Sequence, residues 1–110
     1  MIIKGFDILI ARGDSESIDV EFHGNIPDDG CTAIVSMGKT AAERDLLWTK
    51  SYPIQNGKFT LTLDKENTDY NFNTYKWNIR VLDLDGHLHT PWEEPAKFKI
   101  AEVVGDEELG

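Results

Sequence analysis

The sequence predicts an all-β fold, an immunoglobulin-like sandwich of two sheets built from about seven strands. The strongest observation is the strict alternation along residues 75–81, whose apolar positions are Tyr75, Trp77, Ile79 and Val81. Side chains two residues apart share one face of an extended strand, so this segment buries one face and exposes the other. Turn-forming residues recur between the short apolar segments, which favours antiparallel strands in two packed layers.

Three strands are predicted in the first part of the chain, over residues 6–10, 18–22 and 32–37. Each alternates apolar and polar side chains or is rich in β-branched residues. The segments between them, 12–17 and 25–30, are rich in Gly, Asp, Ser and Asn, which favour turns. The chain therefore begins as a series of strands joined by tight turns.

The middle of the chain continues this pattern with two more strands. Residues 40–45 are polar with good helix formers, and they predict a loop or one helical turn. A weaker strand follows over 47–54, where a proline restricts pairing. The Asn56-Gly57 pair is typical of a hairpin turn, and it leads into a strand over 59–63.

The last part of the chain supplies the remaining two strands. A polar crossover begins with Asp64, which is placed to cap a single helical turn. The long strand follows over 75–83, and Asp85-Gly86 reverses the chain after it because Gly tolerates the positive φ of tight turns. A final strand is predicted over 96–103.

We expect one domain over residues 1–104, followed by an acidic tail or the start of a linker over 105–110. A chain of 110 residues is long enough to bury one core without metal or disulfide staples. Cys31 is the single cysteine, so no internal disulfide forms, which fits a reducing cytoplasm.

The charge balance argues against nucleic acid as a partner. Asp and Glu number 20 against 11 Lys and Arg, which gives a net charge of −9. Such a surface repels phosphate backbones and lacks the basic stripe of a nucleic-acid-binding protein. The sequence also contains no apolar run of about 18 residues, so we expect no membrane insertion.

No pattern in the sequence specifies catalysis, so we expect a protein that is not an enzyme and uses no cofactor. Cys31 follows two aspartates and a glycine, and neighbouring carboxylates disfavour the reactive thiolate. The carboxylate pairs Asp28-Asp29 and Glu93-Glu94 lie in predicted turns, where solvation is their usual role.

Two features of residues 83–89 suggest a metal site, and each has a simpler explanation. The segment Asp83-x-Asp85-Gly86 is similar to the start of a calcium loop, but a hairpin turn explains it fully. The two histidines that follow share one strand face at a spacing that suits zinc, yet solvent-facing strand histidines are commoner. We therefore expect no metal.

The candidate binding residues are charged and aromatic side chains: Arg12, Asp14, Trp48, Tyr52 and Trp92. Exposed aromatic and Arg side chains contribute most to protein contacts, which is the reason for this choice. The first two belong to an Arg-Gly-Asp tripeptide, which a β-turn explains without an adhesive role. The three aromatic residues also suit a sugar-binding platform or the core, and these alternatives stay open here.

Ordered sets of framework residues carry a resemblance to a known kind of module. They are Ile10-Ala11-Arg12-Gly13-Asp14-Ser15-x-Ser17-Ile18-x-Val20-x-Phe22, Gly57-Lys58-Phe59-x-Leu61-x-Leu63-Asp64-x-Glu66-x-Thr68, Tyr75-x-Trp77-x-Ile79-x-Val81, and Phe98-x-Ile100 after the Asp-Gly turn. In this order they resemble the small β-sandwich modules of tailed-phage and prophage structural operons. The chain is similar over nearly its whole length to the N-terminal domain of the phage baseplate upper protein.

The resemblance implies a virion part without catalysis, located in the tail and assembled in the bacterial cytoplasm. Its partners would be other tail or baseplate proteins, and repeated copies on a symmetric tail would strengthen weak contacts. A homo-oligomer and a host-surface glycan stay open as further partners. We therefore expect a tail or baseplate structural protein, with a carbohydrate-binding sandwich as the alternative.

Overall fold

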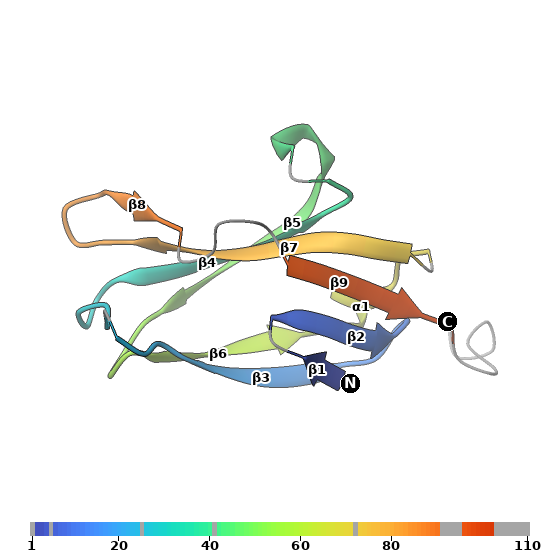
Figure 1. The fold of residues 1–110 in the computed structure, drawn as a ribbon, viewed down its shortest axis with the longest axis horizontal. Coiled ribbons are helices and arrows are strands. Elements are labelled where there is room, and N and C mark those ends of the chain that lie inside the picture. Colours follow the sequence, from blue (N-terminus) through green and yellow to red (C-terminus); the bar gives the residue numbers. More distant parts are fainter. Residues whose placement is uncertain are drawn as a thin grey trace.

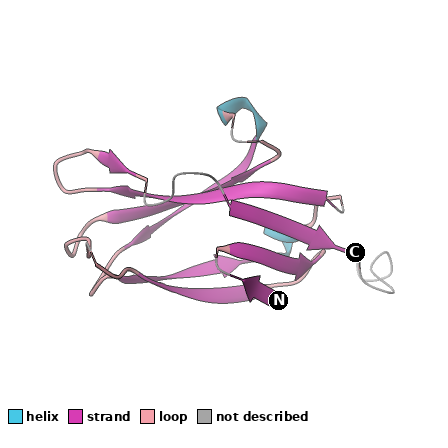
Figure 2. Ribbon diagram, in the orientation of Figure 1, coloured by secondary structure: helices cyan, strands magenta, loops and turns pink. Residues whose placement is uncertain are grey.

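Two β-sheets packed on each other form the protein, as a computed structural model shows (Figure 1). Strands make up most of the regular structure, and the helical segments are short (Figure 2). The structure describes residues 2–4, 6–24, 26–40, 42–71, 73–90 and 96–102. The predicted acidic tail, residues 105–110, lies outside the described residues.

The larger sheet contains seven strands in the described part of the chain. They are β1 (Ile2–Lys4), β2 (Asp7–Ala11), β4 (Thr32–Gly38), β5 (Leu46–Pro53), β7 (Asn73–Leu82), β8 (Leu88–His89) and β9 (Ala96–Ala101). The strand order is β1-β2-β9-β7-β4-β5, and β8 pairs with the end of β7. The β2–β9 pair is parallel, and the other pairs are antiparallel.

The smaller sheet is one antiparallel pair, β3 (Glu16–Glu21) and β6 (Lys58–Leu63). It covers one face of the larger sheet (Figure 1). In immunoglobulin terms β3 and β6 are strands B and E, whereas β4, β7 and β9 are C, F and G, with β5 added beside C. The predicted immunoglobulin-like sandwich is confirmed. All seven predicted strands form, with ends that differ by at most two residues, and β1 and β8 are short additions.

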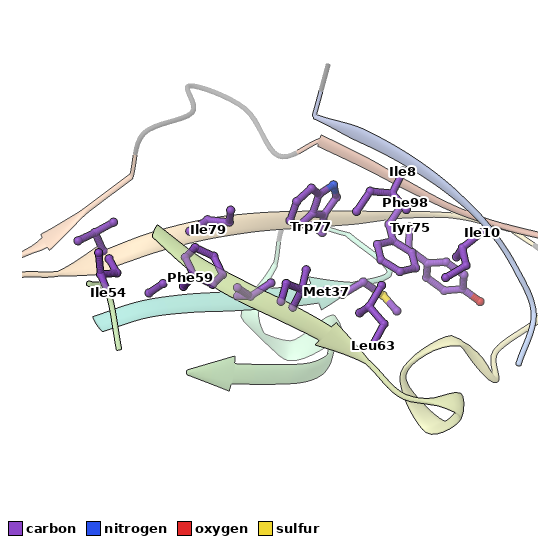
Figure 3. Close-up of a cluster of buried hydrophobic side chains, with 14 of the residues drawn as sticks. Ile8, Ile10, Met37, Ile54, Phe59, Leu63, Tyr75, Trp77, Ile79 and Phe98 are labelled. Atoms are coloured by element: carbon purple, nitrogen blue, oxygen red, sulfur yellow. The ribbon is translucent and has the colours of Figure 1, made fainter. Parts of the chain in front are cut away.

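The core is centred on β7, whose alternating residues Tyr75, Trp77, Ile79 and Val81 are all buried as the sequence predicts. Figure 3 shows Tyr75, Trp77 and Ile79 in one cluster with core side chains of the other strands. Their buried neighbours come from both sheets and are Ile8, Ile10, Cys31, Ala33, Val35, Met37, Ile54, Phe59, Leu61, Leu63, Phe98 and Ile100. Removal of this apolar surface from water is the main force that holds the two sheets together.

A tyrosine corner fixes the start of β7. The Tyr75 hydroxyl donates a hydrogen bond of 2.7 Å to the backbone oxygen of Asn71, four residues upstream, as in immunoglobulin-like sandwiches. In antibody domains a disulfide cysteine follows two residues after this tyrosine. Trp77 occupies that position here, and its indole Nε1 donates to the backbone oxygen of Phe6 at 2.8 Å. A buried, hydrogen-bonded indole thus stands where antibody domains have a disulfide.

The Asn56-Gly57 turn is confirmed, but it does not open a hairpin within one sheet. The two residues have φ of +54° and +68°, as a type I′ turn requires, and Gln55 pairs with Lys58 around them. The preceding strand β5 belongs to the larger sheet, whereas β6 belongs to the smaller one. The turn therefore carries the chain from one sheet to the other.

Two single helical turns complete the fold, and both lie where the sequence predicts them. One is a 3-10 turn at Glu43–Asp45 before β5. The other is α1 (Lys65–Thr68), which follows the cap residue Asp64. The side-chain oxygen of Asn67 accepts the Asp64 backbone N–H at 2.8 Å, which satisfies a donor at the helix start.

Replacement of Tyr75 by Phe should destabilise the fold by about 1 kcal/mol, because the Asn71 carbonyl loses its donor while the ring still fills the core. Urea unfolding of the purified domain measures the change. The matched control is Tyr70→Phe, since the Tyr70 ring packs on Tyr75 but its hydroxyl has no partner among the described residues. Equal losses in both variants would contradict the role of the corner hydrogen bond.

Candidate functional site

Arg12 and Asp14, two of the predicted binding residues, lie in the turn between β2 and β3. The Arg12 Nε donates to the Asp69 carboxylate at 2.9 Å. The backbone oxygen of Asp14 accepts the Thr68 hydroxyl, also at 2.9 Å. The turn is therefore tied to the end of α1, while the Asp14 side chain is exposed.

Trp48 and Tyr52, on β5, are half-buried and pack against core rings. The Trp48 ring meets Phe98 edge-on, and its Nε1 donates to the backbone oxygen of Asn67 at 3.0 Å. The Tyr52 ring stacks on Phe59 with 5.5 Å between centroids. The stacked contact of Tyr52 uses a ring face that a sugar platform would have to offer to a ligand.

Side chains of β5 also close the edge of the smaller sheet. The Thr62 backbone N–H on β6 donates to the Tyr52 hydroxyl at 3.2 Å. The Thr62 backbone oxygen accepts from the Lys50 ammonium group. Both polar groups of this edge residue are thus occupied without a further strand.

Trp92, the fifth predicted binding residue, lies outside the described residues. Of the other four, Arg12, Asp14 and Trp48 all contact the short segment 67–69 around the end of α1. Tyr52 lies farther along β5 and contacts β6 instead. That these residues bind a partner stays a prediction.

The strongest candidate for a functional surface is the outer face of the larger sheet. Lys76, Asn78 and Arg80 point to this face because they alternate with the buried residues of β7. On the neighbouring strand β4, Ser36 lies opposite Asn78 and Ile34 lies opposite Arg80. A groove of about 340 Å³ runs over these positions. Its lining also includes Thr40, Ala42, Leu46 and Thr49.

Asn78 is the least satisfied polar residue on this face. Its side-chain oxygen is buried and has no hydrogen-bond partner among the described residues. Beside it, the hydroxyls of Ser36 and Thr49 bond to each other at 3.1 Å. A buried polar atom without a partner costs about 1–3 kcal/mol, so native proteins seldom keep one without a reason. A ligand in the groove can supply the missing bond once rotation of the Asn78 side chain brings this buried oxygen to the surface.

The outer face is also basic in an otherwise acidic protein. The strands β4, β5, β7 and β9 contain none of the 20 acidic residues of the chain, and this face carries Lys76, Arg80, Lys97 and Lys99, whereas Lys50 of β5 points to the smaller sheet. Lys76 lies directly opposite Lys97, a like-charge arrangement that is unfavourable in the free protein. Among the described residues neither Lys76 nor Arg80 has an ion-pair partner.

The smaller sheet presents the opposite charge. The side chains of Asp19 and Glu21 on β3 are exposed on its outer face. Asp19 accepts the Thr60 hydroxyl at 2.9 Å, and Glu21 lies opposite Lys58. The outer face of the larger sheet is therefore the more basic of the two, although it also carries Asp7 of β2, whose carboxylate accepts the Lys97 backbone N–H at 2.9 Å.

A second cluster of polar groups lies in the turn between β7 and β8, where the sequence suggested a calcium or zinc alternative. One oxygen of Asp83 accepts the backbone N–H groups of Asp85 and His87, each at 2.9 Å. The other oxygen lies 2.7 Å from Nε2 of His89. Asp83, Asp85 and His87 each offer a ligand atom, and these atoms lie within 4.8 Å of one another. The hydrogen bonds already explain the arrangement as a closed turn.

These hydrogen bonds also change the acidity of the turn. The bond to His89, together with those from the backbone of His87 and Asp85, lowers the pKa of Asp83 to about 2 from its ordinary 3.8. A carboxylate that accepts several hydrogen bonds is favoured in its charged form. Asp83 is therefore ionised at neutral and mildly acidic pH.

Cys31 is buried at the start of β4 and lines a hollow of about 550 Å³ at the same end of the sandwich. His23 and His89 line this hollow as well. No hydrogen bond joins the Cys31 thiol to either imidazole among the residues described. A thiol without a base in contact lacks the activation that a cysteine nucleophile needs.

The chain matches no protein-family model, no curated protein and no solved structure. In the described part of the chain, no helix has the length and apolar character needed to cross a membrane. Proposals about function must therefore rest on the surface geometry and on the resemblance in sequence.

The groove was not predicted as a site, although the sequence contained a signal for it. The alternation along β7 places a Lys-x-Asn-x-Arg series on the outer face, but the facing residues of β4 are set by pairing between distant segments. The lack of acidic residues in four strands of an acidic chain is visible in the sequence only once the strands are grouped into a sheet.

Replacement of Asp83 by Asn should destabilise the fold at neutral pH, and the loss should disappear in acid. Because the pKa of Asp83 is lower in the fold, its carboxylate contributes stability that is present above the ordinary value of 3.8 and lost as pH falls toward about 2. Urea unfolding of both proteins at a series of pH values gives the difference. Asp85→Asn is the control, since its side chain accepts no hydrogen bond from the described residues. A difference that is independent of pH would contradict this account.

Proposed function

We propose that the protein is a non-enzymatic structural component of a phage or prophage tail or baseplate, and that it acts through protein–protein contacts. The resemblance of its framework residues to tail-associated β-sandwich modules supports the phage context. The cations and the buried amide oxygen on the outer face of the larger sheet, which have no partner among the described residues, support action by contact. The proposal places the protein in the virion tail, next to other tail or baseplate proteins.

The observation that carries the contact role is the combination, in one groove, of an amide oxygen without a hydrogen-bond partner and two cations without an ion-pair partner among the described residues. Asn78, Lys76 and Arg80 lie along a single strand at every second position. The unbonded Asn78 oxygen and the Lys76–Lys97 pair are costly in the free protein, because unsatisfied amides and crowded like charges are unfavourable. Binding of a complementary chain removes both costs at once.

A protein partner suits this groove better than a sugar does. Sugar sites use exposed aromatic faces, and the one aromatic residue in the described lining, Trp77, is only 5% exposed. Trp48 and Tyr52 have their rings packed against Phe98 and Phe59. The apolar rim at Leu46, which is 44% exposed, is typical of a protein contact with a mixed polar and apolar surface.

Tailed particles of a phage or induced prophage that encodes this chain should contain it. Quantitative mass spectrometry of gradient-purified particles, compared with tail-less heads, measures its presence. A double variant, Lys76→Glu with Arg80→Glu, should be left out of the particles because the contact face changes sign. Lys58→Glu, on the smaller sheet, is the control and should be incorporated normally. Particles that lack the unmodified chain would rule out the tail assignment.

A further inference from the structure

Resting on the proposed function, we infer that the groove binds an extended, acidic segment of a partner protein in one register. Two carboxylates of the segment, four residues apart, pair with Lys76 and Arg80. The side chain midway between them is an amide, and it bonds to Asn78. The partner strand lies flat over the outer face, with its alternate side chains directed into the groove.

The spacing of the three residues sets this register. A strand rises about 3.3 Å per residue, so Lys76 and Arg80 are about 13 Å apart along β7, with Asn78 midway. An extended partner repeats the same distance between its residues i and i+4, and residue i+2 shares their face. A helical partner brings residues i and i+4 to about 6 Å, which is too close to reach both cations.

The chemistry of Asn78 specifies the central residue. An amide offers both a donor and an acceptor, and in the free protein neither has a partner among the described residues. An Asn or Gln of the partner can satisfy both with a pair of hydrogen bonds. A carboxylate at this position would supply acceptors only and would leave the buried Asn78 oxygen unpaired.

The charge of the surroundings favours a polypeptide acid over a phosphate polymer. Lys97 lies across from Lys76, so one end of the groove carries two cations. The whole chain nevertheless has a net charge of −9, and a nucleic acid that extends beyond the groove meets that repulsion. A short peptide avoids most of it, since charges more than about 8 Å away are screened at physiological ionic strength.

The test uses a capped synthetic peptide, Ser-Glu-Thr-Gln-Thr-Glu-Ser, titrated into the isotope-labelled protein and followed by two-dimensional NMR. The expected result is saturable shifts of the Asn78 side-chain amide and of β7 backbone amides. A peptide of equal composition, Ser-Glu-Thr-Gln-Glu-Thr-Ser, is the register control. Its two carboxylates point to opposite faces of an extended chain, so it should bind about fivefold more weakly. Equal binding of both peptides would overturn the register.

Variants separate the roles of the residues. Lys76→Gln and Arg80→Gln should each weaken binding by about fivefold, and raised salt should weaken it further. The unmodified protein should bind the peptide with a central Gln more tightly than one with Leu in its place. Asn78→Leu should remove this preference. Asn78→Ser is the second variant in case the leucine disturbs the sheet. Lys58→Gln on the smaller sheet should bind as the unmodified protein does, and a loss there would show that only net charge matters.

Failure of this inference and failure of the proposed function give different results. Lack of peptide binding, together with loss of the Lys76→Glu/Arg80→Glu variant from tailed particles, would keep the tail function and overturn the acidic segment. Register-dependent peptide binding by a chain that is absent from tailed particles would keep the binding site and overturn the tail function. Shifts that map to the smaller sheet instead of β7 would overturn the site itself.

Discussion

The alternation of side chains along β7 is the constraint on which the rest of the structure depends. This strand pairs with β4 on one side and with β9 and β8 on the other, so it is the centre of the larger sheet. One of its faces supplies Tyr75, Trp77, Ile79 and Val81 to the core, and the other supplies the groove. A slip of one residue would exchange the two sets, so the core fixes the position of the groove residues.

The two sheets are joined without a disulfide by bonds from side chains to backbone. Lys50 and Tyr52 on β5 bond to Thr62 on β6, and Trp48 bonds to the end of α1, which follows β6, whereas the bond from Trp77 to Phe6 ties β7 to the residue before β2 of the same sheet. Each bond satisfies a backbone group at a sheet edge or turn that would otherwise need water or another strand. The half-buried aromatic residues of β5 therefore serve the sandwich itself, and they lie apart from the groove on the outer face of the larger sheet.

The fold was predictable from the sequence to the extent that its signals are local. The strands and turns follow from alternation and from Gly, Asn and Asp at reversals, and these segments appear within two residues of their predicted ends. The path after Asn56-Gly57 was not predictable, because a type I′ turn has the same residues whether its strands stay together or part into two sheets. The groove escaped prediction for a similar reason, since Ser36 and Asn78 meet only through the pairing of β4 with β7.

The parallel pairing of β2 with β9 decides when during synthesis the sheet can close. Ile8 lies opposite Phe98 and Ile10 lies opposite Ile100, so the first long strand of the chain pairs with the last. Such non-local contacts form slowly, because the loop entropy is lost before any contact is gained. On the ribosome β3 to β7 can pair among themselves while β2 has only the short strand β1 beside it. The apolar side chains of β2 stay uncovered until β9 has emerged, which makes the N-terminal strand the part of the nascent chain that needs protection from aggregation longest.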